Sequence, residues 1–358
     1  MKLTKAIKAY FLRRLTRKNI SKFQIKDSKN ILFLRYDRIG DMIITTPVFR
    51  ELKYIYPNVN IIVLASKANK DVLQNNPYID EIFICKKNHI FKDFFLLIKL
   101  RKKQIDVCIE FDHSVIPHAI LRLKAISPKK VISLYKEGRY GVKGHELELY
   151  DIYIDNIQNK HFCDIWLKTL EPFGIQPRSN KYDLFITQNQ EKFAKNFLSK
   201  YLNKKIIGIN IEGAIKEKKI DFTQLKKILE GLFNLNNNIQ IIILSSPKRY
   251  KYINDQVSDF GLKYVASSYL TETILDAAAL IKQMDLVISP DTSIVHIASA
   301  FNIPIISIHE NNLKSHTLFA PKSDHSITVF SKFSDKLEGY NVGKIIRNSI
   351  ELLEKNES

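Results

Sequence analysis

The chain has 358 residues, 45% of them hydrophobic, and a formal net charge of +19 at pH 7. This length and composition exclude a disordered or fibrous protein and allow two buried cores, which favours two domains over one. No apolar run is long enough to span a bilayer and the N-terminus lacks the apolar core of a secretory signal, so we expect a cytoplasmic protein. The three cysteines are too widely spaced for a disulfide framework or a zinc site. The positive charge is expected to attract a polyanion, an anionic membrane surface or phosphorylated small molecules.

The first 26 residues form a basic amphipathic segment. They contain nine Lys or Arg residues and no acidic residue, and Leu3, Ile7, Phe11 and Leu15 recur on one face of a helix. This pattern resembles an interfacial anchor and predicts peripheral contact with the anionic cytoplasmic face of the inner membrane. A solvated basic helix docked on the domain, or an arm that binds nucleic acid, would have the same composition. Because aromatic stacking motifs are missing, nucleic acid is not an expected partner.

Two series of β-rich runs alternate with helical patterns along the chain. The first lies at residues 31–34, 60–64, 81–85, 107–111 and 130–134, and the second at residues 205–210, 239–244, 286–289 and 303–308. Such alternation predicts parallel sheets wrapped by helices, and hence two α/β domains. The pattern breaks between residues 174 and 192, and we place the domains at residues 27–185 and 186–335. The final segment, residues 336–358, contains an expected helix at 342–353 that would pack across the domain junction.

The first strand of the first domain runs directly into a loop that ends in Gly40 and Asp41. In an open α/β sheet, ligands bind where the carboxyl ends of the strands meet, so a carboxylate at this point is placed for chemistry. Asp41 could instead cap the helix that follows. Thr46 before Pro47 is the better capping pattern and predicts a helix from there to about residue 56, which frees Asp41 for another role. Asp37 is an alternative carboxylate in the same loop.

A second motif, residues 286–304, repeats this arrangement with a buried strand, a sharp polar turn and a helix of small residues. The N-terminus of that helix would offer amide groups to a phosphate. Ordinary capping by Asp291 and Thr292, with His296 as a core histidine, is the competing interpretation of the isolated segment.

Together, the two motifs resemble the heptosyltransferase family, glycosyltransferase family nine. Its members have Ile-Gly-Asp with Thr-Pro after an N-terminal strand, and a late Asp-Thr-Gly-x-x-His before an Ala-rich helix and a proline. The resemblance spans about residues 29–320 and implies the GT-B architecture: α/β, with two facing Rossmann-like domains, parallel sheets and a cleft between them. It implies that the first domain binds the acceptor and the second the nucleotide-sugar donor. The implied reaction transfers heptose, with inversion, from ADP-heptose to the inner core of lipopolysaccharide or lipooligosaccharide, which is built on lipid A. The resemblance also implies that this reaction needs neither a metal ion nor a cofactor.

The resemblance also implies roles for particular residues. Asp41 matches the catalytic carboxylate and would act as general base. Lys218 matches a phosphate-binding lysine, although the alignment could place Lys216 or Lys219 there, and several lysines in a polar loop are often solvated surface. The donor-binding residues are expected to be Lys218, Asp291, Thr292, Ser293, Ile294, Val295 and His296. A phosphorylated acceptor calls for basic side chains, and the candidates are Arg38, Arg35, Arg139 and Lys143.

Three departures from the family pattern leave the nucleotide open. Ser293 stands at a usual glycine, Ile220 replaces an aromatic residue, and residues 248–250 (Lys-Arg-Tyr) replace an acidic residue after a strand. Two other functions therefore remain: transfer of another nucleotide sugar to a cell-surface glycan, and a non-catalytic protein of this fold that binds anions at a membrane.

Overall fold

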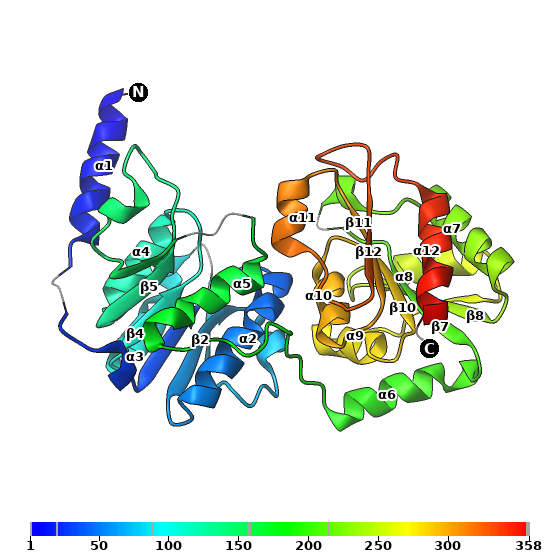
Figure 1. The fold of residues 1–358 in the computed structure, drawn as a ribbon, viewed down its shortest axis with the longest axis horizontal. Helices are drawn as coiled ribbons and strands as arrows, with labels where there is room; N and C mark the ends of the chain where they lie inside the picture. Colours follow the sequence, from blue (N-terminus) through cyan, green and yellow to red (C-terminus); the bar gives the residue numbers. More distant parts are fainter. Residues whose placement is uncertain (1, 19–20, 87–88, 156–158, 214, 356–358) are drawn as a thin grey trace. The chain divides into compact units, whose positions relative to one another are not determined.

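The computed structural model describes residues 2–18, 21–86, 89–155, 159–213 and 215–355. The chain divides into two compact units, residues 1–180 and 181–358. Each unit contains a six-stranded parallel sheet with helices on its faces (Figure 1). The strand orders are β3-β2-β1-β4-β5-β6 and β12-β11-β10-β7-β8-β9, so each unit shows the doubly wound order 3-2-1-4-5-6 when its own strands are numbered from one. The expected α/β class with two Rossmann-like halves is confirmed.

The elements of the first unit follow in chain order. Its strands are β1 (Asn30–Leu34), β2 (Asn60–Ser66), β3 (Glu81–Cys85), β4 (Val107–Glu110), β5 (Lys130–Leu134) and β6 (Ile152–Ile154). Its α-helices are α1 (Lys2–Thr16), α2 (Ile39–Ile55), α3 (Phe94–Lys102), α4 (Pro117–Ile126) and α5 (Phe162–Leu167). Its short 3₁₀ turns are η1 (Ile25–Asp27), η2 (Lys70–Leu73), η3 (Ile90–Asp93), η4 (Gly144–Glu146) and η5 (Lys168–Phe173).

The second unit has the same alternation. Its strands are β7 (Lys205–Asn210), β8 (Ile239–Leu244), β9 (Val265–Ser267), β10 (Leu286–Pro290), β11 (Ile305–His309) and β12 (Ser326–Phe330). Its α-helices are α6 (Gln188–Leu198), α7 (Phe222–Leu235), α8 (Tyr250–Asp259), α9 (Ile274–Ile281), α10 (Ser293–Ala300), α11 (Leu313–Phe319) and α12 (Val342–Lys355). The turns η6 (Ser199–Tyr201) and η7 (Lys216–Lys218) complete it.

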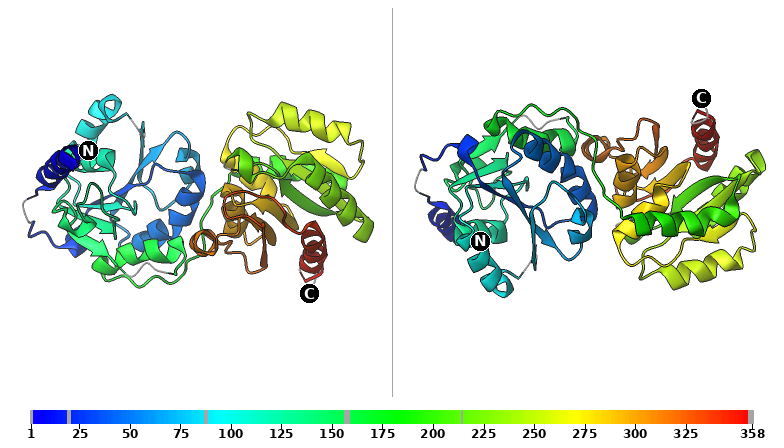
Figure 2. Two further views of the ribbon diagram at one scale, coloured as in Figure 1. Left: turned by 90° about the horizontal axis from the view of Figure 1, so that it is seen from above. Right: turned by 90° about the horizontal axis from the view of Figure 1, so that it is seen from below.

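The first sheet is covered on both faces, which explains why its central strands are continuous apolar runs. On one face, Phe33 of β1 packs edge-on against Phe49 of α2, with ring centroids 4.9 Å apart. The neighbouring residue Leu32 points to the other face and joins a core with α1, α3 and α4. Figure 2 shows the helices of the unit distributed over these two faces.

The basic N-terminal helix α1 docks on the first unit beside α4. Ala9, Leu12 and Thr16 are the buried residues of this contact, whereas Ile7 and Phe11 of the expected apolar face are exposed. The face that packs is therefore rotated from the one that the spacing predicted. Part of the predicted segment, including the side chain of Leu3, lies outside the described residues. Within the described residues, no helix combines the length and the apolar character needed to cross a membrane.

Helix α2 corrects the expected helix start at Thr46 and Pro47. The helix begins at Ile39, and Pro47 lies inside it. Proline has no N–H, so it leaves the carbonyl of the residue four positions earlier without its helical partner. The hydroxyl of Thr46 donates a hydrogen bond to that carbonyl, of Ile43, at 2.7 Å. This contact replaces the lost backbone hydrogen bond and lets α2 continue through the proline.

Helix α12 packs on α7, β10, β11 and β12 of its own unit. Its expected position across the domain junction stays a prediction. Its apolar residues Ile345, Leu352 and Leu353 belong to the second core. Gly231 of α7 permits close approach of the two helices, since a Cβ there would lie 2.3 Å from the side chain of Ile346. The second core therefore accounts for the whole apolar face of α12.

Candidate functional site

The carboxyl edge of the first sheet presents Asp41 in the first turn of α2. Arg38 is the residue before the helix and has extended backbone angles. The carbonyl of Asp41 accepts a hydrogen bond from the Thr45 hydroxyl at 2.7 Å, so the main chain is held by the helix and not by the Asp41 carboxylate. The carboxylate is partly exposed and remains available for a ligand.

Arg35 is buried beneath this edge and contacts both of its carboxylates, Asp37 and Asp41. Its side chain is 4% exposed, and one guanidinium nitrogen lies 3.3 Å from a carboxylate oxygen of Asp41, while another lies 3.4 Å from Asp37. The guanidinium also stacks over the ring of Trp166 in α5, 3.9 Å from the ring centroid. These internal contacts bury Arg35 and place it to hold two carboxylates at the sheet edge. Its expected contact with the acceptor stays a prediction.

A buried polar cluster lies at the end of β4 and in the loop that follows. The carboxylate of Glu110 accepts hydrogen bonds from Lys136 Nζ and from the Ser133 hydroxyl, the latter at 2.9 Å. Burial, together with the charge of Glu110, raises the pKa of Asp112 to about 9. Burial lowers the pKa of His113 to about 4, with help from the positive charges of Lys136 and Arg35. A carboxyl group that is protonated at neutral pH cannot accept a proton, so Asp112 is a poor candidate for a general base.

The other expected acceptor-binding residues are exposed. Arg38 lies at the start of α2, three residues before Asp41. Arg139 and Lys143 lie in the loop after β5, where Arg139 donates to the carbonyl of Val115 at 3.1 Å and its guanidinium lies over the ring of Tyr140. The observed contacts of Arg139 lie in this loop and at Val115. Among the exposed basic candidates, Arg38 is therefore the one that its place in the chain brings close to Asp41.

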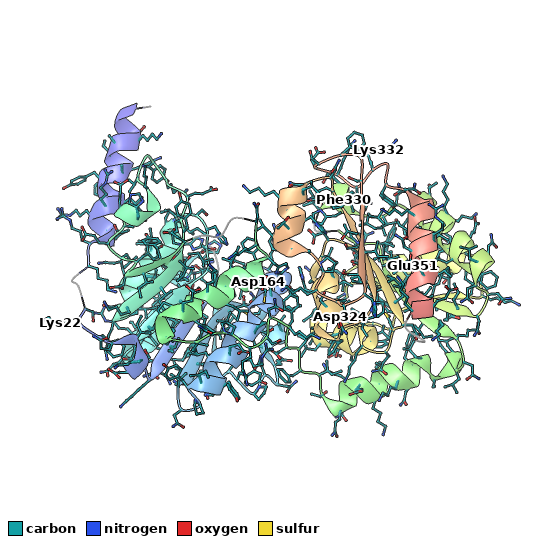
Figure 3. The ribbon with its side chains drawn as sticks, in the orientation of Figure 1. Lys22, Asp164, Asp324, Phe330, Lys332 and Glu351 are labelled. Atoms are coloured by element: carbon teal, nitrogen blue, oxygen red, sulfur yellow. The ribbon has the colours of Figure 1, made fainter. Side chains whose placement is uncertain are left out.

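In the second unit, Asp291 follows β10 and pairs with a histidine that ends β11. His309 Nε2 lies 3.2 Å from a carboxylate oxygen of Asp291, and its Nδ1 lies 3.0 Å from the carbonyl of Glu310. Burial disfavours a charged imidazole, but the hydrogen bond and charge of Asp291 outweigh it and raise the pKa of His309. The rings of His316 and Phe330 pack against His309, at centroid distances of 5.4 and 6.2 Å. Figure 3 labels Phe330, the last residue of β12.

Lys218 lies at the same edge and forms an ion pair with the buried carboxylate of Glu310. Its loop is folded tightly against Gly213, because a Cβ at that glycine would lie 1.6 Å from the Lys218 carbonyl oxygen. The backbone N–H of Ile220 donates to the Ile211 carbonyl at 3.0 Å and closes the loop. The ammonium group is thus presented from a fixed backbone. Lys219 is exposed, and the side chain of Lys216 lies outside the described residues.

The turn before α10 is fixed by a network of neutral polar groups. Thr292 is the N-cap of α10, and its hydroxyl accepts from the Ile294 amide at 3.3 Å. Asn210, at the end of β7, donates to the hydroxyls of Thr292 and Ser289 at 3.1 and 3.0 Å. Ser293 is the first residue of α10 and is not among the described residues with positive φ, so its Cβ causes no backbone strain.

The expected donor-binding residues therefore separate into two groups. Asp291, Thr292, Ser293 and Ile294 are partly exposed at the sheet edge. Val295 and His296 are buried, and the His296 ring packs between Tyr182 and Phe319 at centroid distances of 6.1 and 6.5 Å. A ligand at this edge would meet Val295 through its backbone.

Three residues of this edge were not predicted: Asn210, His309 and Glu310. All follow or end a predicted strand, as Asp41 does, so the same rule applied to β7 and β11 would have found them. Asp291, His309 and Glu310 offer three potential metal-ligand atoms within 4.8 Å of one another. The Lys218 ammonium already neutralises Glu310, and a metal ion would have to compete with it.

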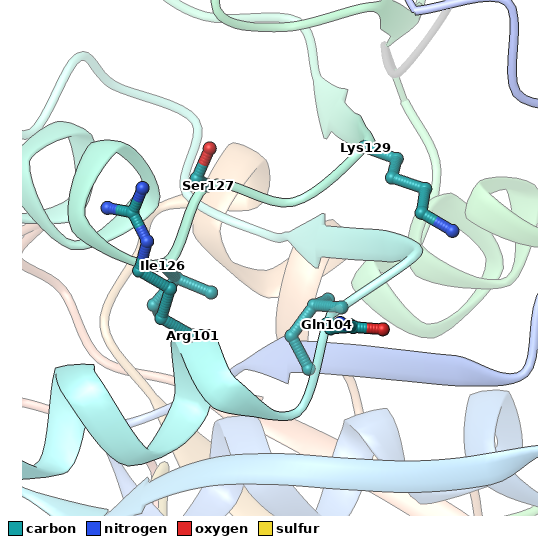
Figure 4. A pocket seen from close by; sticks show the side chains of 6 residues that line it. Arg101, Gln104, Ile126, Ser127 and Lys129 are labelled. Atoms are coloured by element: carbon teal, nitrogen blue, oxygen red, sulfur yellow. The ribbon is translucent and has the colours of Figure 1, made fainter.

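A pocket of about 410 Å³ lies elsewhere on the first unit (Figure 4). It is lined by Arg101, Gln104, Ile105, Ile126, Ser127 and Lys129. These residues precede β4 and β5, which places the pocket at the amino ends of the strands. It is therefore at the opposite edge of the sheet from Asp41, where an α/β sheet does not usually bind ligands.

Comparisons with known proteins show the family of the chain. The family model described as Glycosyltransferase family 9 (heptosyltransferase) matches residues 95–338. The lipopolysaccharide core heptosyltransferase OpsX of Haemophilus influenzae is 24% identical over 86% of this chain and 86% of its own length.

Two solved structures share the fold. The glycosyl transferase family 9 protein of Veillonella parvula has a TM-score of 0.75 at 18% identity, covering 95% of this chain and 99% of its own. The Escherichia coli ADP-heptose lps heptosyltransferase II has a TM-score of 0.71 at 17% identity, covering 92% and 100%. With the family model matching more than half of its length, the chain belongs to glycosyltransferase family 9, the heptosyltransferase family, and is a glycosyltransferase of GT-B fold.

Proposed function

We propose that this glycosyltransferase transfers heptose from ADP-heptose to the core of lipopolysaccharide or lipooligosaccharide, with inversion and without a metal ion. The names of the curated relatives support the acceptor, and the solved heptosyltransferase II supports the donor. The observation that carries the proposal is the pair of sheet edges: Asp41 held by Arg35 in one unit, and Lys218 with the α10 N-terminus in the other.

In the first unit, Asp41 acts as the general base. It removes the proton from an acceptor hydroxyl as that oxygen attacks the anomeric carbon, which develops oxocarbenium character. Arg35 fixes the orientation of the carboxylate through its contact with Asp41 and its stacking on Trp166. Exposed Arg38, with Arg139 and Lys143 from the loop after β5, binds phosphate or carboxylate groups of the acceptor.

In the second unit, Lys218 and the amides at the start of α10 stabilise the departing nucleoside diphosphate. A lysine and a helix N-terminus can carry out this role without a metal ion. Because Lys218 is paired with Glu310, the diphosphate must share or replace that carboxylate as the partner of the ammonium group. Asp291, held by His309, is left to bind hydroxyl groups of the sugar.

The test is a donor screen. Release of nucleoside diphosphate is measured from ADP-heptose and from common UDP- and GDP-sugars, with heptose-deficient lipooligosaccharide as acceptor and a chelator present. Turnover of ADP-heptose under these conditions supports the proposal, including its independence of metal. Turnover of a different donor only would keep the mechanism and replace the substrate. No turnover by folded protein would favour a non-catalytic anion-binding role.

Another nucleotide sugar is the second candidate because of one local feature. Glu212, two residues beyond β7, pairs with Arg249 at 3.6 Å and accepts the Ser246 amide at 2.8 Å. The loop after β8 has Lys248 and Arg249 where the family pattern has an acidic residue, and Glu212 holds this loop in place. This change affects the region expected to meet the nucleoside, and the same donor screen decides it.

A further inference from the structure

The outer surface of the first unit has an unusual concentration of exposed phenylalanine. Residues 90–102 form η3 and α3, and within them Phe91 is 93% exposed, Phe95 83% and Phe94 59%, with Ile98 also exposed. We call Phe91, Phe94, Phe95 and Ile98 the aromatic patch. The rings of Phe94 and Phe95 contact each other edge-on, with centroids 5.6 Å apart. Large apolar side chains grouped in this way usually mark an interaction surface.

The aromatic patch is not a displaced part of the core. Helix α3 already buries an inward face, since Leu97 and Leu100 are buried and pack in the same cluster as α4. The exposed phenylalanines are additional to that face, and Phe91 and Phe95 leave most of their surface in water. They therefore need a partner outside this unit to be removed from water.

The surface around the aromatic patch is positively charged. Residues 86–103 contain seven Lys or Arg residues and one carboxylate, Asp93. That carboxylate is turned inward and forms an ion pair with fully buried Arg122 at 2.7 Å. At the far end of α3, Lys103 pairs with Glu81 of β3. The segment thus directs apolar rings and positive charge outward while its own negative charge is hidden.

Helix α1 adds a second element with the same character. Both α1 and α3 pack on α4, so they cover the same face of the first sheet, and Figure 2 shows them on that side of the unit. Helix α1 carries no acidic residue and exposes Ile7, Tyr10 and Phe11. Its buried residues fix it on the unit, so these side chains are presented from an ordered helix.

We infer that the aromatic patch, together with α1, docks the enzyme on an anionic lipid bilayer. Phenylalanine side chains enter the boundary between headgroups and acyl chains, while Lys and Arg contact anionic headgroups. A protein partner fits less well, because lysine is depleted from protein–protein interfaces and here it surrounds the rings. The inference rests on the proposed function in one respect, that a lipopolysaccharide-core acceptor is anchored in a membrane. It extends the membrane contact expected of residues 1–26 to α3.

The experiment is co-sedimentation of the full chain with phosphatidylcholine vesicles, with and without phosphatidylglycerol. Wild type should bind the anionic vesicles, less strongly at high salt. The double variant Phe91→Ser and Phe95→Ser should lose about tenfold or more in partition coefficient, because two buried rings are removed from the bilayer. Leu202→Ser is the matched control, since Leu202 is 76% exposed on the second unit. Unfolding curves check that each variant is folded.

Two results would overturn the inference: vesicle binding by the double variant equal to wild type, or absence of vesicle binding by wild type. A wild-type dimer that the double variant converts to monomers, without vesicle binding, would assign the patch to a second copy of the chain. Transfer to a deacylated, soluble core oligosaccharide is measured in parallel. Activity there without vesicle binding refutes only the membrane contact, whereas vesicle binding through the patch without any transfer refutes only the proposed function.

Discussion

Replacement of Asp41 by asparagine is the most direct test of the first-unit site. Asparagine keeps the shape of the side chain and removes its charge and basicity. The main chain should not change, because Thr45 and Arg35 donate to the Asp41 carbonyl, which the substitution leaves in place. Any large effect on turnover would then come from the carboxylate itself.

The expected sizes of the two effects differ. Removal of a general base costs about 10² to 10⁴ in rate, which corresponds to about 3 to 5 kcal/mol in the activation free energy. Stability should fall much less. Arg35 loses a contact of 3.3 Å but keeps Asp37 and the Trp166 ring, so we expect a decrease of about 1 kcal/mol in the free energy of unfolding.

The assay measures kcat and KM for both substrates, together with urea unfolding. Asp37→Asn is the matched control, because Asp37 pairs with the same guanidinium at a similar distance. If loss of charge beside Arg35 were the cause, both variants would lose activity equally. A kcat for Asp41→Asn within about tenfold of wild type, with a large loss for Asp37→Asn, would refute our assignment and identify Asp37 as the base.

Three further predictions concern the other parts of the structure. Gly213→Ala should raise the donor KM by about tenfold or more, because its Cβ would collide with the Lys218 carbonyl; an unchanged KM in donor titrations would contradict the loop geometry. Asp93→Ala should lower the free energy of unfolding by about 3 to 5 kcal/mol, since it leaves Arg122 charged and buried, and a loss below 1 kcal/mol in urea unfolding would count against this. The raised pKa of His309 means that its stabilising effect is complete below about pH 6.5 and is lost as the pH rises through the native pKa. His309→Gln should flatten the dependence of unfolding free energy on pH in that range, and an unchanged slope would show that another group is responsible.

The central strands could be predicted from the sequence because burial on both faces makes each of them a continuous apolar run. The expected runs at 31–34, 60–64 and 205–210 coincide with β1, β2 and β7 to within two residues. Three strands were not predicted: β6, β9 and β12, which lie at sheet edges. Each is only partly buried, so its sequence lacks a continuous apolar run. The edge strand β3 was predicted at 81–85 because it keeps a continuous apolar run, so the missing run, and not edge position alone, is what hides β6, β9 and β12 from a local pattern.

For single residues of the candidate site, too, the sequence predicts local features better than contacts between distant parts of the chain. Asp41 and Asp291 could be found because each follows its own strand in a short motif. The partner of Lys218 could not, since Glu310 is 92 positions away and meets it only because β11 is placed beside β10. The Pro47 pattern failed for a related reason: a hydroxyl one residue earlier compensates the missing N–H, so the helix start depends on a side-chain contact and not on the proline alone. Sequence motifs therefore located the candidate groups at the sheet edges, whereas the contacts that hold them, Arg35 on Asp41 and Glu310 on Lys218, required the tertiary structure. Those contacts also bear on the energetics of the proposed mechanism, in which a donor diphosphate would compete with Glu310 for Lys218 before it gains from the lysine's charge.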